Sequence, residues 1–264
     1  MASTERLLIE RNDGVVTVTL NRPHRKNAVP GAMWDDITAA FRDIADRRTD
    51  RVVILTGAGG DFCSGADLAG DGEAPPPDHD AHTLADMRRV TAACIAIAEC
   101  PKPTIAKVSG VAVGAGLNMA LACDLVVADR TARFAEIFAK RGLSVDFGGS
   151  WFLPRRIGLH RAKELAFFAD LIDADEADRI GLVNRIVDND QLDEFVAQWA
   201  GRLAAGPPIA LAQTKRLLHE SFESTLAQAL DREGTAQTVN FTTADTKEAV
   251  SAFIERRDPE FHGR

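Results

Sequence analysis

The sequence of 264 residues contains no tyrosine, so any acid or base chemistry must use other side chains. Its four cysteines have no CxxC spacing and no zinc-type pairing with histidine, which predicts reduced, mostly buried thiols and no metal site. No apolar run is long enough to cross a bilayer, and the N-terminal segment lacks the apolar core of a signal peptide. We therefore expect a cytoplasmic protein with no membrane partner.

Basic residues are in the minority, because 39 acidic against 31 basic side chains give a net charge of −8. This balance argues against nucleic acid as the main partner. Apolar residues make up 45% and charged residues 27% of the chain, which is typical of a globular protein with a core. Folding at this length buries roughly three-quarters of the surface, so one large domain, or a domain with an appendage, is expected.

Strand-like and helix-like segments alternate over residues 1–190. The β-branched alternation at 15–20 and the apolar run at 51–56 predict strands, and 103–108, 125–128 and 182–187 read similarly. Between the first two strands, apolar residues spaced by three and four predict a core-facing helix: Trp34, Ile37, Phe41 and Ile44. This alternation favours an α/β fold with a largely parallel sheet.

Only helical periodicity remains beyond residue 190. The predicted helices span 192–203, 209–218, 226–237 and 246–257. Asp245 with Glu248 resembles a capping box for the last helix, whose apolar stripe would contain Ala249, Val250, Phe253 and Ile254. Residues 191–264 are thus a separate helical region, which packs either on a partner subunit or on the core of the same chain. The proline- and acid-rich stretch 70–80 predicts a surface loop.

Two glycine-containing turns each follow a predicted strand. They are Cys63-Ser-Gly-Ala-Asp67 and Gly110-Val-Ala-Val-Gly114-Ala-Gly116, and neither has the spacing of a dinucleotide or phosphate loop. Such turns expose backbone N–H groups, and at a helix N-terminus these favour negative charge. Singly, each is an ordinary tight turn; together they would form an oxyanion hole.

Several motifs occur in one order along the chain: Asn21-Arg-Pro23, Phe62-Cys-Ser-Gly-Ala-Asp67, Lys102-Pro103, Gly110-x3-Gly114-Ala-Gly116, Cys123-Asp124 and Gly148-Gly149. This ordered set resembles the crotonase (enoyl-CoA hydratase/isomerase) superfamily, and the similarity runs from about Leu7 to Arg257. The resemblance implies a crotonase-type ββα spiral core in residues 1–190 and a trimerisation region in 191–264. It also implies a homotrimer or homohexamer that acts on acyl-CoA thioesters, with no cofactor besides the coenzyme A carried by the substrate.

The resemblance also assigns roles to single residues. Ala66 and Ala115 would supply the two N–H groups that hold the thioester oxygen as it becomes an enolate. The positions implied to bind the acyl-CoA are Arg25, Lys26, Ala28, Asp67, Leu68, Asn118 and Phe138, with Phe253 and Arg256 reaching the nucleotide end in a neighbouring subunit. Arg25, Lys26 and Arg256 are therefore either the cationic patch for the CoA phosphates or solvated surface charges.

The positions of the two hydratase glutamates carry Asn118 and Phe138, so both of those carboxylates are missing. Glu136 lies two residues too early, and its spacing to Gly148 favours a surface glutamate. Asp146 stands where several isomerases of the superfamily, and a hydrolytic dehalogenase, place their aspartate. Its apolar neighbours predict desolvation, which raises the pKa of a carboxyl and suits a general base. The alternative role of Asp146 is to cap the helix that begins near Gly148.

A single carboxylate above an enolate suits a proton shuttle between two carbons. We therefore predict double-bond or ring isomerisation of an enoyl-CoA thioester with Asp146 as the shuttle, most similar to the ring-isomerising branch of phenylacetate degradation. The alternatives are an enoyl-CoA hydratase and a catalytically weak acyl-CoA-binding protein. RNA binding is disfavoured because the first predicted helix is net acidic. Acyl specificity is assigned to the segment 70–87 and to a pocket near Phe138 and Trp151.

Overall fold

The fold was obtained as a computed structural model, which describes residues 5–68 and 83–264. In these ranges a six-stranded sheet has the order β1-β2-β3-β4-β6-β9, and a three-stranded sheet has the order β5-β7-β8. Every neighbouring pair in the larger sheet is parallel except β1 with β2. The strands are β1 (Leu7–Asn12), β2 (Val15–Leu20), β3 (Val52–Gly57), β4 (Thr104–Val108), β5 (Val111–Val113), β6 (Leu125–Asp129), β7 (Arg133–Ala135), β8 (Ile172–Asp173) and β9 (Arg185–Val187). The predicted α/β class with a largely parallel sheet is confirmed.

Helices follow most of the strands, and they account for the rest of the regular structure. The α-helices are α1 (Gly31–Asp46), α2 (Thr83–Ala98), α3 (Ala115–Ala122), α4 (Gly149–Ile157), α5 (Leu159–Phe168), α6 (Ala174–Arg179), α7 (Leu192–Ala204), α8 (Pro208–Ser221), α9 (Leu226–Thr242) and α10 (Ala244–Glu255). The 3-10 turns are η1 (Pro23–Arg25), η2 (Ala58–Gly60) and η3 (Ile137–Arg141). None of the helices in the described ranges is long and apolar enough to span a membrane.

The hairpin of β1 and β2 follows from its two turn residues. Asp13 and Gly14 both have positive φ, at 47° and 82°, which is the conformation that a two-residue hairpin turn needs. β2 then alternates buried and half-buried residues, whereas Val52 to Thr56 of β3 are all buried. β3 is therefore a central strand that is covered on both faces.

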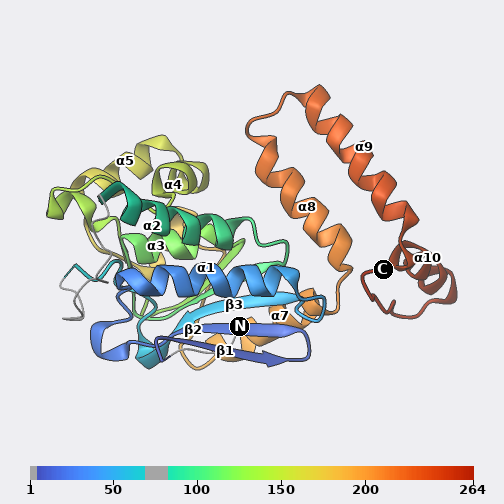
Figure 1. Cartoon of the computed structure of the whole chain (residues 1–264), viewed down its shortest axis with the longest axis horizontal. Coiled ribbons are helices and arrows are strands. Elements are labelled where there is room, and N and C mark those ends of the chain that lie inside the picture. The colour runs from blue at the N-terminus through green and yellow to red at the C-terminus, as the bar shows by residue number, and fades with distance from the viewer. Residues whose placement is uncertain (1–4, 69–82) are drawn as a thin grey trace.

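Helices cover both faces of the large sheet. Figure 1 shows α1, α2 and α3 stacked on one side of β1 to β3. All four apolar residues predicted for α1 are buried in the main core. On the other face, α7 packs Leu192, Val196 and Ala200 against Val52 and Ile54 of β3 in a smaller core. The four cysteines are free and buried, as predicted.

The helices α8 to α10 stand off from this core. Figure 1 shows α8 and α9 as a hairpin that projects past the sheet, with α10 after α9 at the open end of the hairpin, opposite the α8–α9 turn. α8 has no buried residue, and α9 buries only Ala236. Large apolar side chains of α8 to α10 and the α8–α9 turn are exposed: Leu218, Phe222, Leu226, Leu230, Val239, Phe241, Val250, Phe253 and Ile254.

The predicted capping box is wrong. The N-cap of α10 is Thr243, whose hydroxyl accepts the Thr246 N–H. Asp245 is buried and accepts the backbone N–H groups of His262 and Gly263 at 2.8 and 2.9 Å. The carboxylate is therefore used to hold the C-terminal tail, a long-range contact that the local spacing does not reveal. The last strand of the sheet also begins at Arg185 rather than 182, and the predicted loop 70–80 lies outside the described residues.

We expect Asp245→Ala to release the tail. Each hydrogen bond to a charged acceptor contributes about 1.5–3 kcal/mol, so the amides of His262 and Gly263 should exchange with deuterium roughly 10- to 100-fold faster. Hydrogen exchange followed by mass spectrometry measures this. Asp258→Ala, an exposed carboxylate of the same tail, is the control and should leave exchange unchanged. Unchanged protection in Asp245→Ala would contradict the assignment.

Candidate active site

The N–H of Ala66 is turned away from its neighbouring strand. An isolated parallel bridge joins Val29 and Ala66. In it the Val29 N–H donates to the Gly65 carbonyl, and the Asp67 N–H donates to the Val29 carbonyl, both at 2.9 Å. Because polar groups of successive residues in an extended chain point to opposite sides, the N–H of Ala66 points away from Val29.

The second predicted donor lies close by, at the N-terminus of α3. A Cβ placed on Gly65 would lie 3.5 Å from the Ala115 nitrogen and 2.9 Å from the Val113 oxygen. A Cβ on Gly116 would lie 2.2 Å from the Cys63 oxygen. Among the described residues no hydrogen-bond acceptor is recorded for the N–H of Ala66 or Ala115. The fold therefore brings the two N–H groups together, and only glycine at 65 and 116 permits this approach.

Asp146 lies half-buried in the loop before α4, with a buried Oδ1 that has no hydrogen-bond partner in the described part of the chain. Burial raises the pKa of its carboxyl to about 6. The capping alternative is contradicted, because the N-cap of α4 is Gly148 and no side chain caps it. The expected desolvation is present, although Leu143 itself is exposed and contributes little to it.

Asn118 and Glu136 form a buried polar group beside Asp146. The Asn118 Nδ2 donates to the backbone carbonyl of Asp146 at 2.9 Å and lies 3.4 Å from Glu136 Oε2. Both side chains are fully buried, so the prediction of a surface glutamate is wrong. Burial, with a smaller contribution from the charge of Asp146, raises the pKa of Glu136 to about 8. Asn118 therefore contacts Asp146 rather than open space where substrate would lie.

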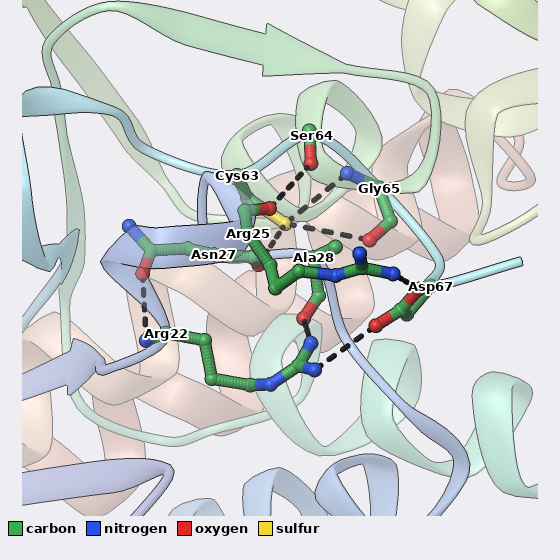
Figure 2. A network of polar contacts seen from close by, with 8 residues as sticks. All are labelled: Arg22, Arg25, Asn27, Ala28, Cys63, Ser64, Gly65 and Asp67. Carbon is green, nitrogen blue, oxygen red and sulfur yellow. Dashed lines mark hydrogen bonds and ion pairs between the residues drawn. The ribbon is translucent and has the colours of Figure 1, made fainter. Parts of the chain in front are cut away.

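Asp67 holds two arginines together, as Figure 2 shows. Its Oδ2 accepts from Arg22 at 3.0 Å and its Oδ1 from Arg25 at 2.9 Å. The Arg22 guanidinium also donates to the carbonyl of Ala28. Since Arg22 and Asp67 are both buried, this pair ties the segment around residues 22–29 to the segment that carries Ala66. Arg22 belongs to the Asn21-Arg-Pro23 motif, but nothing in the sequence indicates its buried partner.

The remaining residues predicted to bind CoA differ in exposure. The Lys26 side chain is 60% exposed and lies 3.5 Å from Asp61, and Leu68 is also exposed. Ala28 is buried and its carbonyl accepts from Arg22, so its side chain offers no surface. The Arg25 side chain keeps 39% exposure while it pairs with Asp67. Lys26 and Arg25 are thus the accessible cations of this segment.

Phe138 is buried beside Gly114, whereas the two α10 residues lie away from the site. Phe138 is buried, and its ring would be 3.6 Å from a Cβ on Gly114, so it packs behind the turn that precedes Ala115. Phe253 is 85% exposed, and Arg256 ends α10 in a left-handed conformation. Figure 1 places α10 at the opposite end of the molecule from α4. Within one chain, therefore, neither α10 residue joins the site.

A cavity of about 1020 Å³ opens between α2, α4 and α8. Its wall includes Cys94, Phe147, Gly148 and Trp151, so it adjoins the loop of Asp146. Neither Ala66 nor Ala115 lines it. Trp151 therefore lines this cavity, whereas Phe138 is not part of its described wall.

Comparison with known proteins gives these features a context. A family model described as enoyl-CoA hydratase/isomerase matches residues 10–264. The chain belongs to the enoyl-CoA hydratase/isomerase family. It is 39% identical to a probable enoyl-CoA hydratase of Rhodobacter capsulatus, with 97% of each chain covered. It is 36% identical to the 1,2-epoxyphenylacetyl-CoA isomerase of Escherichia coli, over 98% of this chain and 99% of that one.

Solved structures agree with the fold. A putative enoyl-CoA hydratase from Streptomyces coelicolor A3(2) superposes with a TM-score of 0.93 at 39% identity, covering 100% of this chain and 98% of that one. The predicted crotonase-type fold and superfamily are thereby confirmed. As a member of the enoyl-CoA hydratase/isomerase family, the protein is an enzyme of acyl-CoA metabolism.

We expect Gly65→Ala to impair the two N–H donors of this family member. The new methyl group would lie 2.9 Å from the Val113 carbonyl, so the segment must move away from α3. Loss of one oxyanion donor costs about 10²- to 10³-fold in rate. Deuterium uptake at the α-carbon of an acyl-CoA thioester, followed by NMR, measures enolate formation directly.

Gly60→Ala is the matched control for this substitution. Gly60 also has a positive φ, of 87° against 96° for Gly65, but no atom lies within 4 Å of its added Cβ. Both variants therefore carry backbone strain, and only Gly65→Ala has the clash. Equal rates of deuterium uptake at the α-carbon in the two variants would show that the close approach of Gly65 to α3 is unimportant for enolate formation.

Proposed function

We propose that the protein catalyses double-bond or ring isomerisation of an enoyl-CoA thioester, with Asp146 as the group that carries the proton. The observation that supports this most directly is a half-buried carboxylate at Asp146, while the hydratase positions hold Asn118 and Phe138. Neither of these side chains can orient and deprotonate a water molecule as a carboxylate does. The named activity of the Escherichia coli relative, an isomerase, agrees with this proposal.

The proposed reaction uses Asp146 twice. Its carboxylate removes a proton from C2 of a 3-enoyl thioester; the C2–H electron pair delocalises into a dienolate whose charge rests on the thioester oxygen. The N–H groups of Ala66 and Ala115 stabilise that charge. The protonated Asp146 then returns the proton to C4, forming a C4–H bond and leaving a 2-enoyl thioester. No proton or electron is gained or lost overall.

Enoyl-CoA hydration is the second candidate. It is favoured by Glu136, because hydratases use two carboxyl groups and this carboxyl lies in one polar cluster with Asp146. The Rhodobacter capsulatus relative is named a probable hydratase. The test is to supply purified protein with a 3-enoyl-CoA and, separately, with crotonyl-CoA, and to follow the absorbance of the conjugated thioester. Rapid hydration of crotonyl-CoA without isomerisation would reject our proposal, and CoA binding without either reaction would indicate a binding protein.

Removing the base should remove the reaction. Asp146→Asn is expected to lower kcat by 10²-fold or more, because general-base catalysis contributes about 10²–10⁴-fold. In the wild type the ionised carboxylate is the active form, and its pKa is raised to about 6. kcat/KM should therefore fall as the pH drops through about 6. An acid limb near the ordinary pKa of aspartate, or a fully active Asp146→Asn, would contradict this role.

We further propose that Arg25 and Lys26 bind the phosphates of CoA and that three copies of the chain associate through α8 to α10. Support for the association comes from the exposed apolar residues of these helices and from α8, which buries none of its residues within the described chain. α10, which carries Phe253 and has Arg256 as its C-cap, lies far from α4 in Figure 1, so we propose that these two residues reach the site of another copy.

The association predicts a change in mass. Val250 and Ile254 are exposed and four residues apart on α10, so they share one face of the helix. Replacing both by aspartate should convert a trimer or hexamer into monomers in light scattering at fixed protein concentration. Lys247→Asp, at an exposed polar position of the same helix, is the control. A monomeric wild type would contradict the proposal.

A further inference from the structure

The polar cluster behind the proposed base contains more acceptors than donors. Asn118 Oδ1 and Glu136 Oε1 are both buried, and neither has a hydrogen-bond partner in the described ranges. The two N–H groups of Asn118 Nδ2 are both used, since one donates to the Asp146 carbonyl and the other to Glu136 Oε2. An ionised carboxylate would offer acceptors only, whereas a protonated one adds an O–H donor. One proton on Glu136 supplies the hydrogen-bond donor that this cluster lacks.

The shapes of the two side chains favour a paired arrangement. Amide and carboxyl groups are planar and have similar spacing between their two polar atoms. When the amide N–H donates to one carboxyl oxygen, a proton on the other oxygen faces the amide oxygen. A charged Glu136 in this position would instead lose its hydration and regain only a long contact with Asn118, at 3.4 Å.

The Asn118 amide is also the contact that holds the Asp146 backbone. The Asp146 carbonyl accepts from Asn118 Nδ2 and from the Gly149 N–H, both at 2.9 Å. A Cβ on Gly149 would lie 2.4 Å from Nδ2, so the start of α4 confines the amide on its other side. Glu136 itself follows Ala135, whose carbonyl accepts the Gly114 N–H at 2.8 Å beside the oxyanion turn.

We propose that Glu136 is a positioning residue, a neutral acid that fixes the Asn118 amide and, through it, the backbone of Asp146. This inference rests on the proposed role of Asp146 as the base. Glu136 does not reach substrate, because it is fully buried. Its carboxyl group stays protonated, and the O–H group faces the oxygen of the Asn118 amide.

The two carboxyls then divide the pH range. Burial raises the pKa of Asp146 to about 6 and that of Glu136 to about 8. Between these values Asp146 is ionised and Glu136 is neutral, which is the competent state. Above about 8 an ionised Glu136 leaves Asn118 Oδ1 without a donor and adds negative charge near the enolate. Among the described residues, Cys94 of α2 is the further titratable group that interacts with Asp146; burial raises its pKa to about 12, so it stays neutral across this range.

The experiment compares Glu136→Gln, Glu136→Leu and the exposed control Glu164→Gln. Glutamine keeps one donor and one acceptor but cannot ionise, so we expect kcat at pH 7 within about 3-fold of wild type and no decline of the rate above pH 8. Leucine leaves the Asn118 oxygen unpaired, and kcat should fall about 10- to 100-fold with little change in KM, the size of effect that a misplaced group produces. Glu164→Gln should keep the alkaline decline.

A second readout does not depend on turnover. The wild type should show an infrared C=O band of a protonated carboxylic acid at pH 7 that is absent from Glu136→Gln. If the enzyme does not isomerise the substrate, the pH profile is measured by deuterium uptake at the α-carbon instead of by turnover. Failure of the proposed isomerisation is thereby distinguished from failure of the proposed role of Glu136. An alkaline decline that persists in Glu136→Gln, or the absence of the infrared band from the wild type, would overturn the proposal.

Discussion

The approach of Gly65 to the first turn of α3 is the contact on which the site depends. It sets two backbone N–H groups from distant parts of the chain side by side, and any larger residue at 65 or 116 would meet a carbonyl oxygen. The sheet order supports this contact, because β3 and β4 are adjacent and deliver both segments to one edge. The bridge between Val29 and Ala66 then fixes the direction of one donor. Donors held in this way need no rearrangement when charge develops on a thioester oxygen.

The pairs of Asp67 with Arg22 and Arg25 secure that geometry from the outside. A buried ion pair contributes little net stability, because the desolvation of its charges offsets their attraction, but breaking it is costly. Its value here is geometric, since it joins the segment around Arg25 to the segment of Ala66. The same pairing directs the Arg25 guanidinium partly toward protein and leaves Lys26 as the more exposed cation. An acidic chain thus keeps two accessible cations beside the segment that carries Ala66.

Burial acts on two carboxyls to different degrees and gives them different states. Asp146 keeps some exposure, whereas Glu136 has none, and the pKa of each rises accordingly. Asn118 stands between them and donates to both, and its own oxygen gains a donor in the proposed state in which Glu136 carries a proton. The position that holds a carboxylate in hydratases is thus occupied by an amide that supports another carboxyl. In the proposed mechanism, this exchange of roles leaves the site able to move a carbon-bound proton but without the carboxylates that activate water.

The sequence by itself determined the fold class, the core of α1, the free cysteines, the family and the motifs that carry Ala66, Ala115 and Asp146. These follow from local periodicity and from motif order, which a linear chain displays. Only the tertiary structure decided that Asp67 pairs with Arg22, that Asp245 holds the tail instead of capping α10, and that Glu136 is buried. Each of these is a charged residue whose partner or covering lies far away along the chain. The energy of a charge depends on its surroundings in space, and sequence spacing does not record those surroundings.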